Sequence, residues 1–359
     1  MPRWLKDAGC QKPLLVTDKS IAQLDLCQDL YRSLSQNDLD PYLYDEAEGN
    51  PVKMHVDRGV EKYKSSDCDC VLMLGGGCAL DVGKAIALMV RHPGDLFDYE
   101  DGKEDARPVD QKIPFMLAIP TTAGTGSEVG ASSVISDDQT HAKVIIWSPR
   151  LMPNLVVADP CLTVSLPPNL TAATGMDALT HNIEAYLAKS YHPICEGIAL
   201  EGINLVFQHL ENAYRTPDSL EARKGMLMAS MMGAIAFQKG LGVTHSMAHA
   251  LSTCYDLHHG LANAVSLRAC LQFNREAIPE KFSRIASSLG LSGTKEQLGS
   301  IFIEKVTELK NAVGMSKSLK DLGIDIGDKL ITTAFNDSCH QNNPRACTRE
   351  DFYRLFQES

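Results

Sequence analysis

Short apolar runs alternate with helical segments in the first part of the chain. The runs lie in KPLLVTD, CVLMLG and PFMLAIP, and apolar residues recur with helical spacing between them, as in 52–63. Val71–Leu74 has no polar residue, which is typical of a strand that is covered on both faces. Strands that alternate with helices predict a parallel sheet in a doubly wound α/β domain. ASSVISD and HAKVIIWS then predict a β-hairpin, and NLVVADP predicts a closing strand.

The pattern changes beyond Pro160. Leu166, Pro167 and Pro168 interrupt the chain, and from Leu170 onward the apolar residues follow a helical period with few β-branched runs. We therefore expect an α/β domain over 1–160 and an all-α domain over 161–359. The predicted helices cover roughly 168–188, 192–213, 219–240, 242–253, 260–275, 278–288, 295–313, 327–337 and 348–357.

Length, charge and cysteine usage limit the class of protein. A chain of 359 residues is long enough for two domains. The net charge of -11 argues against a nucleic-acid partner, because such partners need a clustered basic surface. No apolar run is long enough for a bilayer, and the N-terminus MPRWLKDAGCQ has no signal-peptide core. Eleven cysteines without a CxxC pair suit reduced thiols, so we expect a cytoplasmic protein with no membrane partner.

Histidines are concentrated in one short segment. The stretch 239–264 carries His245, His249, His258 and His259, and the first two share a helix face. Upstream, Asp177 lies four residues before a further histidine in ATGMDALTH. One carboxylate and several imidazoles on facing helices would bind a first-row metal such as Fe(II) or Zn(II). A single buried histidine is usually a core residue, and spacing alone does not choose among the four downstream histidines.

Two loops after predicted strands are suited to a nucleotide. Gly75, Gly76 and Gly77 lie where a strand passes into a helix, so the backbone and the helix N-terminus can approach a pyrophosphate. A plain tight turn is the alternative, because the spacing is not GxGxxG. The second loop, TTAGTGSE, is rich in hydroxyl groups. Asp18 ends the first strand and would repel a 2′-phosphate, which favours NAD over NADP, although a turn-forming aspartate is the simpler interpretation.

Four motifs together resemble the iron-containing alcohol dehydrogenase family. They are GGGCALDVGK at 75–84, PTTAGTGSEVG at 120–130, ATGMDALTH at 173–181 and HSMAHALSTCYDLHHGLANA at 245–264. They occur in the family order, and the similarity extends over nearly the whole chain from Pro13. The resemblance implies a dehydroquinate synthase-like fold, in which 1–160 is the NAD-binding domain and 161–359 is the helical metal-binding domain.

The resemblance also implies the roles of individual residues. It assigns the metal to Asp177, His181, His245 and His259. It places His249 near the substrate, where we expect this side chain to pass the released proton to solvent, and it gives His258 no role. The residues implied to line the NAD site are Asp18, Asn50, Gly75, Gly76, Gly77, Thr121, Thr122, Thr125, Lys143 and Leu162.

Three departures from the family pattern change this expectation. Cys78 stands where the family usually has serine, which would weaken a phosphate hydrogen bond without removing the backbone donors. Gly130 replaces a common threonine. The chain begins at what would be the first helix of the family, so we expect its N-terminal β-hairpin to be missing.

The predicted reaction is reversible hydride transfer between NAD and a primary alcohol, diol or hydroxy acid, with the aldehyde as the oxidised partner. A divalent metal lowers the pKa of a coordinated oxygen, and Fe(II) is the expected ion, with Zn(II) as an alternative.

An NAD- and metal-dependent lyase or synthase is the second hypothesis, but a phosphorylated substrate would need cleft lysines or arginines that the metal motifs lack. A non-catalytic nucleotide-binding protein is the third, and it predicts lost ligands. The resemblance further implies a homodimer or higher homo-oligomer.

Overall fold

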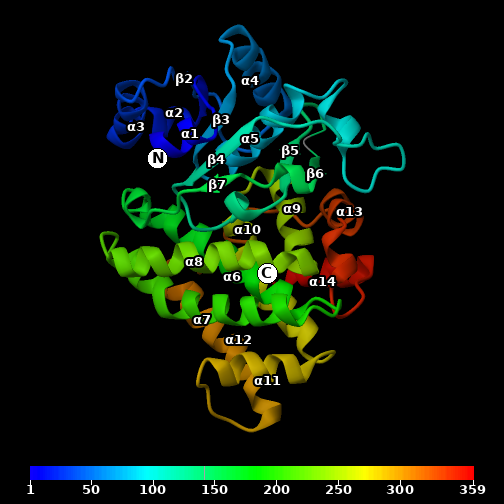
Figure 1. Ribbon diagram of the computed structural model, residues 1–359. Helices are drawn as coiled ribbons and strands as arrows, with labels where there is room; N and C mark the ends of the chain where they lie inside the picture. The colour runs from blue at the N-terminus through cyan, green and yellow to red at the C-terminus, as the bar shows by residue number, and fades with distance from the viewer. Residues whose placement is uncertain (141) are drawn as a thin grey trace. The chain divides into compact units, whose positions relative to one another are not determined.

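Parallel strands form a single sheet with the order β2-β1-β3-β4-β7 in the computed structural model, which describes residues 1–140 and 142–359 (Figure 1). The register aligns Leu72 with Leu15 on one side and with Leu117 on the other. This confirms the parallel sheet that the apolar runs predict. The strands are β1 (Pro13–Val16), β2 (Tyr42–Tyr44), β3 (Cys70–Gly75), β4 (Phe115–Pro120) and β7 (Leu155–Val156).

Helices cover both faces of this sheet, as the fully apolar strands require. On one face Val71 and Met73 pack with α4 and α5, and on the other face Leu72 packs with α1 and α3 (Figure 1). The helices are α1 (Pro2–Asp7), α2 (Lys19–Ala22), α3 (Asp25–Gln36), α4 (Lys53–Ser65) and α5 (Gly77–Met89). The continuous helical pattern that the sequence predicts after the first strand is divided into α2 and α3, because Leu24 has an extended backbone.

The predicted hairpin forms a separate antiparallel sheet of β5 (Ser132–Ser136) and β6 (Lys143–Trp147). His141, which begins the second predicted strand, lies outside the described residues. Lys84 of α5 holds the segment before the hairpin, since its buried Nζ donates to the carbonyl oxygens of Gly130 and Ser132 at 2.8 and 2.9 Å. Short 3-10 helices complete this part of the chain: η1 (Leu96–Tyr99), η2 (Ser127–Val129), η3 (Pro149–Leu151) and η4 (Pro160–Thr163).

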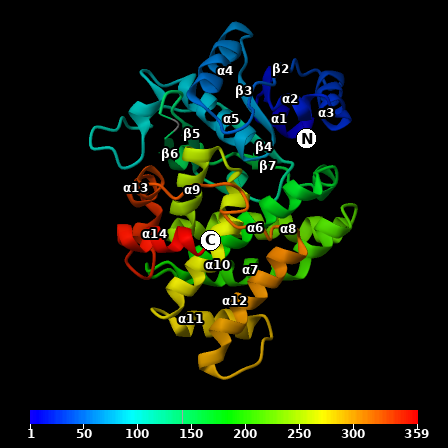
Figure 2. The same cartoon turned by 180° about the vertical axis from the view of Figure 1, so that it is seen from behind.

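The remainder of the chain is helical, and each helix predicted there is present within a few residues. Helices α6, α7 and α8 pack on one another and share one apolar core, while α9, α10, α13 and α14 surround a second core (Figures 1 and 2). The elements are α6 (Pro168–Leu187), α7 (Pro193–Arg215), α8 (Leu220–Ala236), η5 (Phe237–Lys239), α9 (Val243–Tyr255), α10 (His259–Arg275), α11 (Pro279–Ser288), α12 (Lys295–Ala312), α13 (Asp328–Asn336), η6 (Cys339–Asn342) and α14 (Arg349–Gln357).

The described chain divides into two structural units. The first comprises 1–122 and 127–163, and the second comprises 123–126 and 164–359. In the part of the chain that the structure describes, no single helix has the length and apolar character of a membrane span. The segments 220–239 and 243–255, which are bent relative to each other, reach that length and apolar character only when the two are taken together.

Candidate metal and cofactor sites

Helix α6 carries an unusual buried polar face. Asp177, His181 and Glu184 are spaced by four and three residues, so their side chains lie on one side of the helix. All three are at most 5% exposed. Buried charged groups are costly unless they are paired or bind a metal. This face therefore needs partners from other helices.

Helices α9 and α10 supply those partners from their first turns. His245 is the third residue of α9, and His259 is the first residue of α10. The start of α10 can approach α6 closely because residue 260 is glycine: a Cβ there would lie 2.1 Å from the carbonyl oxygen of Ala173. The close contact brings the imidazole of His259 beside the carboxylate of α6.

Four potential ligands converge in this place. The Nε2 atoms of His181, His245 and His259 lie 3.8, 3.9 and 3.4 Å from the same oxygen, Oδ1 of Asp177. The four ligand atoms lie within 4.8 Å of one another. Four ligands at about 2.1 Å from a tetrahedral ion would be roughly 3.4 Å apart, so the separations require little adjustment. His258, the N-cap residue of α10, is not one of the four groups.

In His245 and His181 the other ring nitrogen, Nδ1, is hydrogen-bonded, which leaves Nε2 as the potential ligand atom. Nδ1 of His245 lies 2.7 Å from Oε2 of Glu184, and Nδ1 of His181 lies 3.3 Å from the carbonyl oxygen of Gly124. Both partners accept hydrogen bonds, so both Nδ1 atoms carry the proton. Carboxylates and carbonyl groups in this role orient metal-binding histidines.

Glu184 has a second task at the start of α9. Its carboxylate also accepts the backbone N–H groups of Gly242 at 2.9 Å and Thr244 at 2.7 Å. Burial opposes its charge, but the hydrogen bonds from His245 and Thr244 are sufficient to lower the pKa of Glu184. A buried carboxylate at a helix N-terminus is stabilised by the free N–H groups there. The same anion therefore fixes the position of α9 and the orientation of His245.

Asn263 contacts two of the four potential ligands, Asp177 and His259. Nδ2 of Asn263 donates to Oδ1 of Asp177 at 2.8 Å and lies 3.2 Å from Nε2 of His259. The buried Nε2 of His245 has no hydrogen-bond partner among the described residues. A buried nitrogen without a partner, beside two further imidazoles and a carboxylate, fits a bound Fe(II) or Zn(II) ion.

His249 lies beside this cluster but is not part of it. Its ring stacks on that of His259, with centroids 5.3 Å apart, and its Nδ1 lies 2.8 Å from Oδ2 of Asp337. Oδ1 of Asp337 accepts the hydroxyl of Ser246 at 2.7 Å and the backbone N–H of Cys339 at 2.9 Å. Burial opposes the charge of this carboxylate, yet the positive charge of His249 holds the pKa of Asp337 well below its usual value.

Acid is expected to weaken the fold of the metal-stripped protein. Burial lowers the pKa of His181 to about 4, from an ordinary value of 6.5. The unfolded chain takes up this proton first, so the stabilisation is complete above about pH 6.5 and is lost as the pH falls toward 4, by about 3 kcal/mol. Urea unfolding at several pH values measures the effect in wild type and in His181→Asn. Equal pH dependence in the two proteins would contradict this assignment.

The predicted cofactor residues of the first unit gather at one edge of its sheet. Asp18 follows β1, the glycines follow β3, and Thr121 and Thr122 follow β4. The strands are parallel, so these positions share the carboxyl edge, where ligands of α/β sheets bind. Gly75 has a φ of 155°, and a Cβ there would lie 2.7 Å from that of Ala79. Glycine therefore permits the sharp entry into α5, which begins at Gly77.

The remaining cofactor candidates are more dispersed. Asn50 precedes Pro51, whose carbonyl oxygen accepts the N–H of Ser136, and Ser136 pairs with Lys143 across the hairpin. Leu162 packs against the apolar face of the sheet that α3 covers. Thr125 belongs to the short segment 123–126 that groups with the second unit. The oxygen Oδ1 of Asp18 caps α2 through the N–H groups of Ser20 and Ile21.

Sequence reasoning missed four polar residues that hold these sites. Glu184 could have been found, because it lies on the same face of its helix as Asp177 and His181. Lys84 lies within the glycine motif, but its contacts are with residues 127–132, more than 40 positions away. Asn263 lies one helical turn after His259, which it contacts, but its other partner, Asp177, is 86 residues distant. Asp337 gave no local signal, since His249 is 88 residues distant.

Comparisons with known proteins agree with the fold and the cluster. Residues 1–160 match the model of iron-containing alcohol dehydrogenase, and 171–359 match that of the Fe-containing alcohol dehydrogenase family, C-terminal. The 4-hydroxybutyrate dehydrogenase of Cupriavidus necator is 35% identical, over 98% of this chain and 93% of the relative. The NAD-dependent methanol dehydrogenase of Bacillus methanolicus is 33% identical, over 99% and 94%. A crystal structure of 1,3-propanediol oxidoreductase superimposes with a TM-score of 0.95 at 34% identity, covering 100% of this chain and 94% of the other.

Proposed function

Because the chain belongs to the iron-containing alcohol dehydrogenase family, we propose that it transfers hydride reversibly between a primary alcohol and NAD. The observation that carries the proposal is the convergence of one carboxylate oxygen and three imidazole Nε2 atoms within 4.8 Å. Asp177, His181, His245 and His259 would hold Fe(II), with Zn(II) as the alternative ion. When bound, such an ion supplies Lewis acidity that makes an alcohol proton easier to remove.

The residues of the chain provide binding, orientation and proton handling. Glu184 and the carbonyl group of Gly124 keep the protons of two imidazoles on Nδ1, which leaves Nε2 of each to bind an ion. His249 is the candidate proton carrier, because it stacks on His259 and its Nδ1 is held by Asp337. Its Nε2 is then the atom that exchanges a proton with substrate or solvent.

The carboxyl edge of the sheet is the proposed NAD site. The N-terminus of α5 and its glycines offer free N–H groups to the pyrophosphate. Thr121 and Thr122 add hydroxyl groups beside them, and the backbone N–H of Thr121 is fixed on the carbonyl oxygen of Gly75 at 3.0 Å. The cofactor carries out the redox chemistry, while the protein positions it.

The names of the relatives support small primary alcohols as substrates. They mention 4-hydroxybutyrate, methanol and 1,3-propanediol, which share a terminal hydroxyl group. The test is NAD reduction by anaerobically purified, iron-loaded protein with a panel of primary alcohols, diols and hydroxy acids. Alcohol-dependent NADH formation is expected. Absence of turnover with every member of the panel, in either direction, would contradict the proposal.

The alternative of an NAD- and metal-dependent synthase is not favoured, since the relatives named above are dehydrogenases. A homodimer or higher homo-oligomer and a cytoplasmic location remain predictions from the sequence. Sedimentation equilibrium of the purified chain tests the first, and fractionation of the source cells tests the second.

Asp18→Gly is expected to raise the use of NADP relative to NAD by about tenfold. Removing one negative charge beside the ribose eliminates a repulsion of roughly 1–2 kcal/mol toward a 2′-phosphate. Glycine is also tolerated at a helix N-cap, so α2 should be retained. The ratio of kcat/KM for the two cofactors measures the change, with the exposed Asp29→Gly variant as a control for lost charge. An unchanged ratio would reject this role of Asp18.

Asp337→Asn is expected to lower kcat by about tenfold and to leave metal content unchanged. The asparagine keeps the shape of the side chain but loses the negative charge that accepts the hydrogen bond of Nδ1 of His249. A pH profile of kcat should shift as well, because His249 would lose its anionic partner. If kcat and its pH profile matched those of wild type, Asp337 would have no part in proton transfer.

A further inference from the structure

A second group of potential metal ligands lies in the first unit, far along the strands from the proposed NAD site. Cys10 comes just before β1, and Cys70 begins β3. These strands are neighbours, with Pro13 opposite Cys70. One ligand atom each of Cys10, Asp69 and Cys70 lies within 4.8 Å of the others. All three residues are at the amino edge of the sheet, whereas Gly75, Gly76 and Gly77 are at its carboxyl edge.

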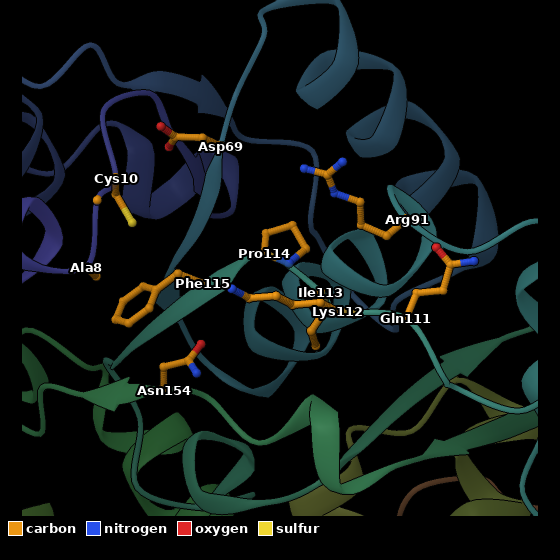
Figure 3. Close-up of a pocket in the computed structure, with 11 residues that line it drawn as sticks. Ala8, Cys10, Asp69, Arg91, Gln111, Lys112, Ile113, Pro114, Phe115 and Asn154 are labelled. Atoms are coloured by element: carbon orange, nitrogen blue, oxygen red, sulfur yellow. The ribbon is translucent and has the colours of Figure 1, made fainter.

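Two members of the group, Cys10 and Asp69, form part of the wall of a cavity of about 660 Å³. Cys10 and Asp69 lie together on one side of this cavity, and Arg91 and Gln111 lie on the other (Figure 3). Cys10 is 5% exposed and Cys70 is fully buried, while Asp69 is exposed. An ion from solvent would therefore meet the carboxylate and the Cys10 thiol first, with Cys70 behind them.

The carboxylate is already oriented by the backbone. The N–H of Gln11 donates to Oδ2 of Asp69 at 2.7 Å, and the N–H of Lys12 donates to Oδ1 at 3.1 Å. Each oxygen keeps a further lone pair for a ligand bond. A hydrogen bond between the two thiols lowers the pKa of Cys10, whereas the same bond, burial and the negative charge of Asp69 raise the pKa of Cys70 well above its usual range. The hydrogen bond between the two sulfur atoms places them next to each other, so one ion can reach both. A cation that displaces both thiol protons would bind two thiolates and one fixed carboxylate.

We propose that Cys10, Asp69 and Cys70 form a zinc-class cation site that is separate from the histidine cluster. In a tetrahedral zinc site with Zn–S of about 2.3 Å and Zn–O of about 2.0 Å, the ligand atoms are roughly 3.5–3.8 Å apart. The three ligand atoms lie within 4.8 Å of one another, so shifts on the order of 1 Å would bring them to that spacing. The cavity leaves the fourth position open to water. No electron is transferred: two S–H bonds are broken, two metal–sulfur bonds form, and two protons go to solvent.

The surroundings indicate which ions the site would take. Arg91 and Lys112 also line the cavity, so its charge does not favour cations in general. The thiolates must supply the affinity, and thiolates prefer Zn(II) or Cd(II) to Mg(II) or Ca(II). Bound metal would link the segment before β1 to the start of β3 and stabilise the first unit.

Cadmium titration of the reduced full-length chain tests the proposal, because cadmium–thiolate bonds absorb in the ultraviolet and the histidine cluster contains no sulfur. The titration uses a Cys339→Ser background, since that thiol lies beside His249 and Asp337. One cadmium ion per chain is expected to produce the absorption and to release about two protons. Excess magnesium should not displace it.

Matched variants distinguish this site from the other thiols. Cys10→Ser and Cys70→Ser should lose the absorption, and Asp69→Asn should weaken binding. Cys68→Ser, two residues from Cys70 but outside the cluster, and the exposed Cys161→Ser should retain it. Cys10→Ser avoids the fully buried position and therefore keeps the test valid if Cys70→Ser does not fold. Unchanged absorption in Cys10→Ser, or displacement of cadmium by magnesium, would overturn the proposal.

Discussion

His259→Ala is expected to lose bound metal and alcohol-dependent NAD reduction together, with turnover falling by about 10³-fold or more. The side chain contributes one of the four converging ligand atoms, 3.4 Å from the carboxylate oxygen of Asp177. Without it three groups remain, and the several kcal/mol that a Lewis acid contributes to the reaction would be lost. Metal per chain by elemental analysis and kcat with the best alcohol are the measurements.

His258→Ala is the matched control, because it removes the neighbouring imidazole, which is outside the cluster. It should retain metal and most of the activity. Both variants should show wild-type circular dichroism at neutral pH. Full turnover by a metal-free His259→Ala protein would contradict the ligand assignment, as would an equal loss of metal in the two variants.

Glu184→Gln is expected to weaken metal binding by about 10–100-fold and to destabilise the fold by about 2–4 kcal/mol. The affinity falls because a neutral amide oxygen accepts the Nδ1 proton of His245 more weakly than the carboxylate, 2.7 Å away, and so makes Nε2 a less basic ligand. The fold is weakened because the same carboxylate accepts the N–H groups of Gly242 and Thr244 at the start of α9. Metal competition against a chelator and urea unfolding measure the two effects.

Glu201→Gln, on the exposed side of α7, controls for the loss of one negative charge. It should change neither quantity by more than about 0.5 kcal/mol. A Glu184→Gln protein with normal stability but weakened metal binding would limit the role of Glu184 to orienting His245. Normal values of both would contradict its place beside the metal.

Local pattern was sufficient to predict most of the fold. Val71–Leu74 has the pattern of a doubly covered strand because helices do cover both of its faces. The helices after Pro167 were predictable because each has a proline, serine, threonine or glycine near its start and a periodic apolar face. The break between α2 and α3 was not, since it depends on the extended backbone of Leu24, which no residue type at that position demands.

The sequence pattern predicted only part of the candidate metal site. Spacing placed Asp177 and His181 on one helix face, but it could not choose between His258 and His259. Adjacent residues point in different directions, and which of the two points toward α6 depends on where α10 starts. That start depends on the contact of Gly260 with α6. The family resemblance selected His259, and this is the residue whose Nε2 lies beside Asp177.

The hydrogen-bond partner of His249 could not be predicted from the sequence. Asp337, the C-cap residue of α13, and His249 of α9 are 88 residues apart, and no periodicity links these two helices. The packing of α13 and η6 against α9 brings them together. A buried carboxylate with several donors is therefore recognised from three-dimensional contacts rather than from spacing.

Anomalous diffraction at the iron and zinc absorption edges, from crystals of anaerobically purified protein, tests the metal assignment most directly. One strong peak is expected in the helical unit, about 2.0–2.2 Å from Oδ1 of Asp177 and from Nε2 of His181, His245 and His259. Iron or zinc bound elsewhere while these four atoms point away from one another would contradict it.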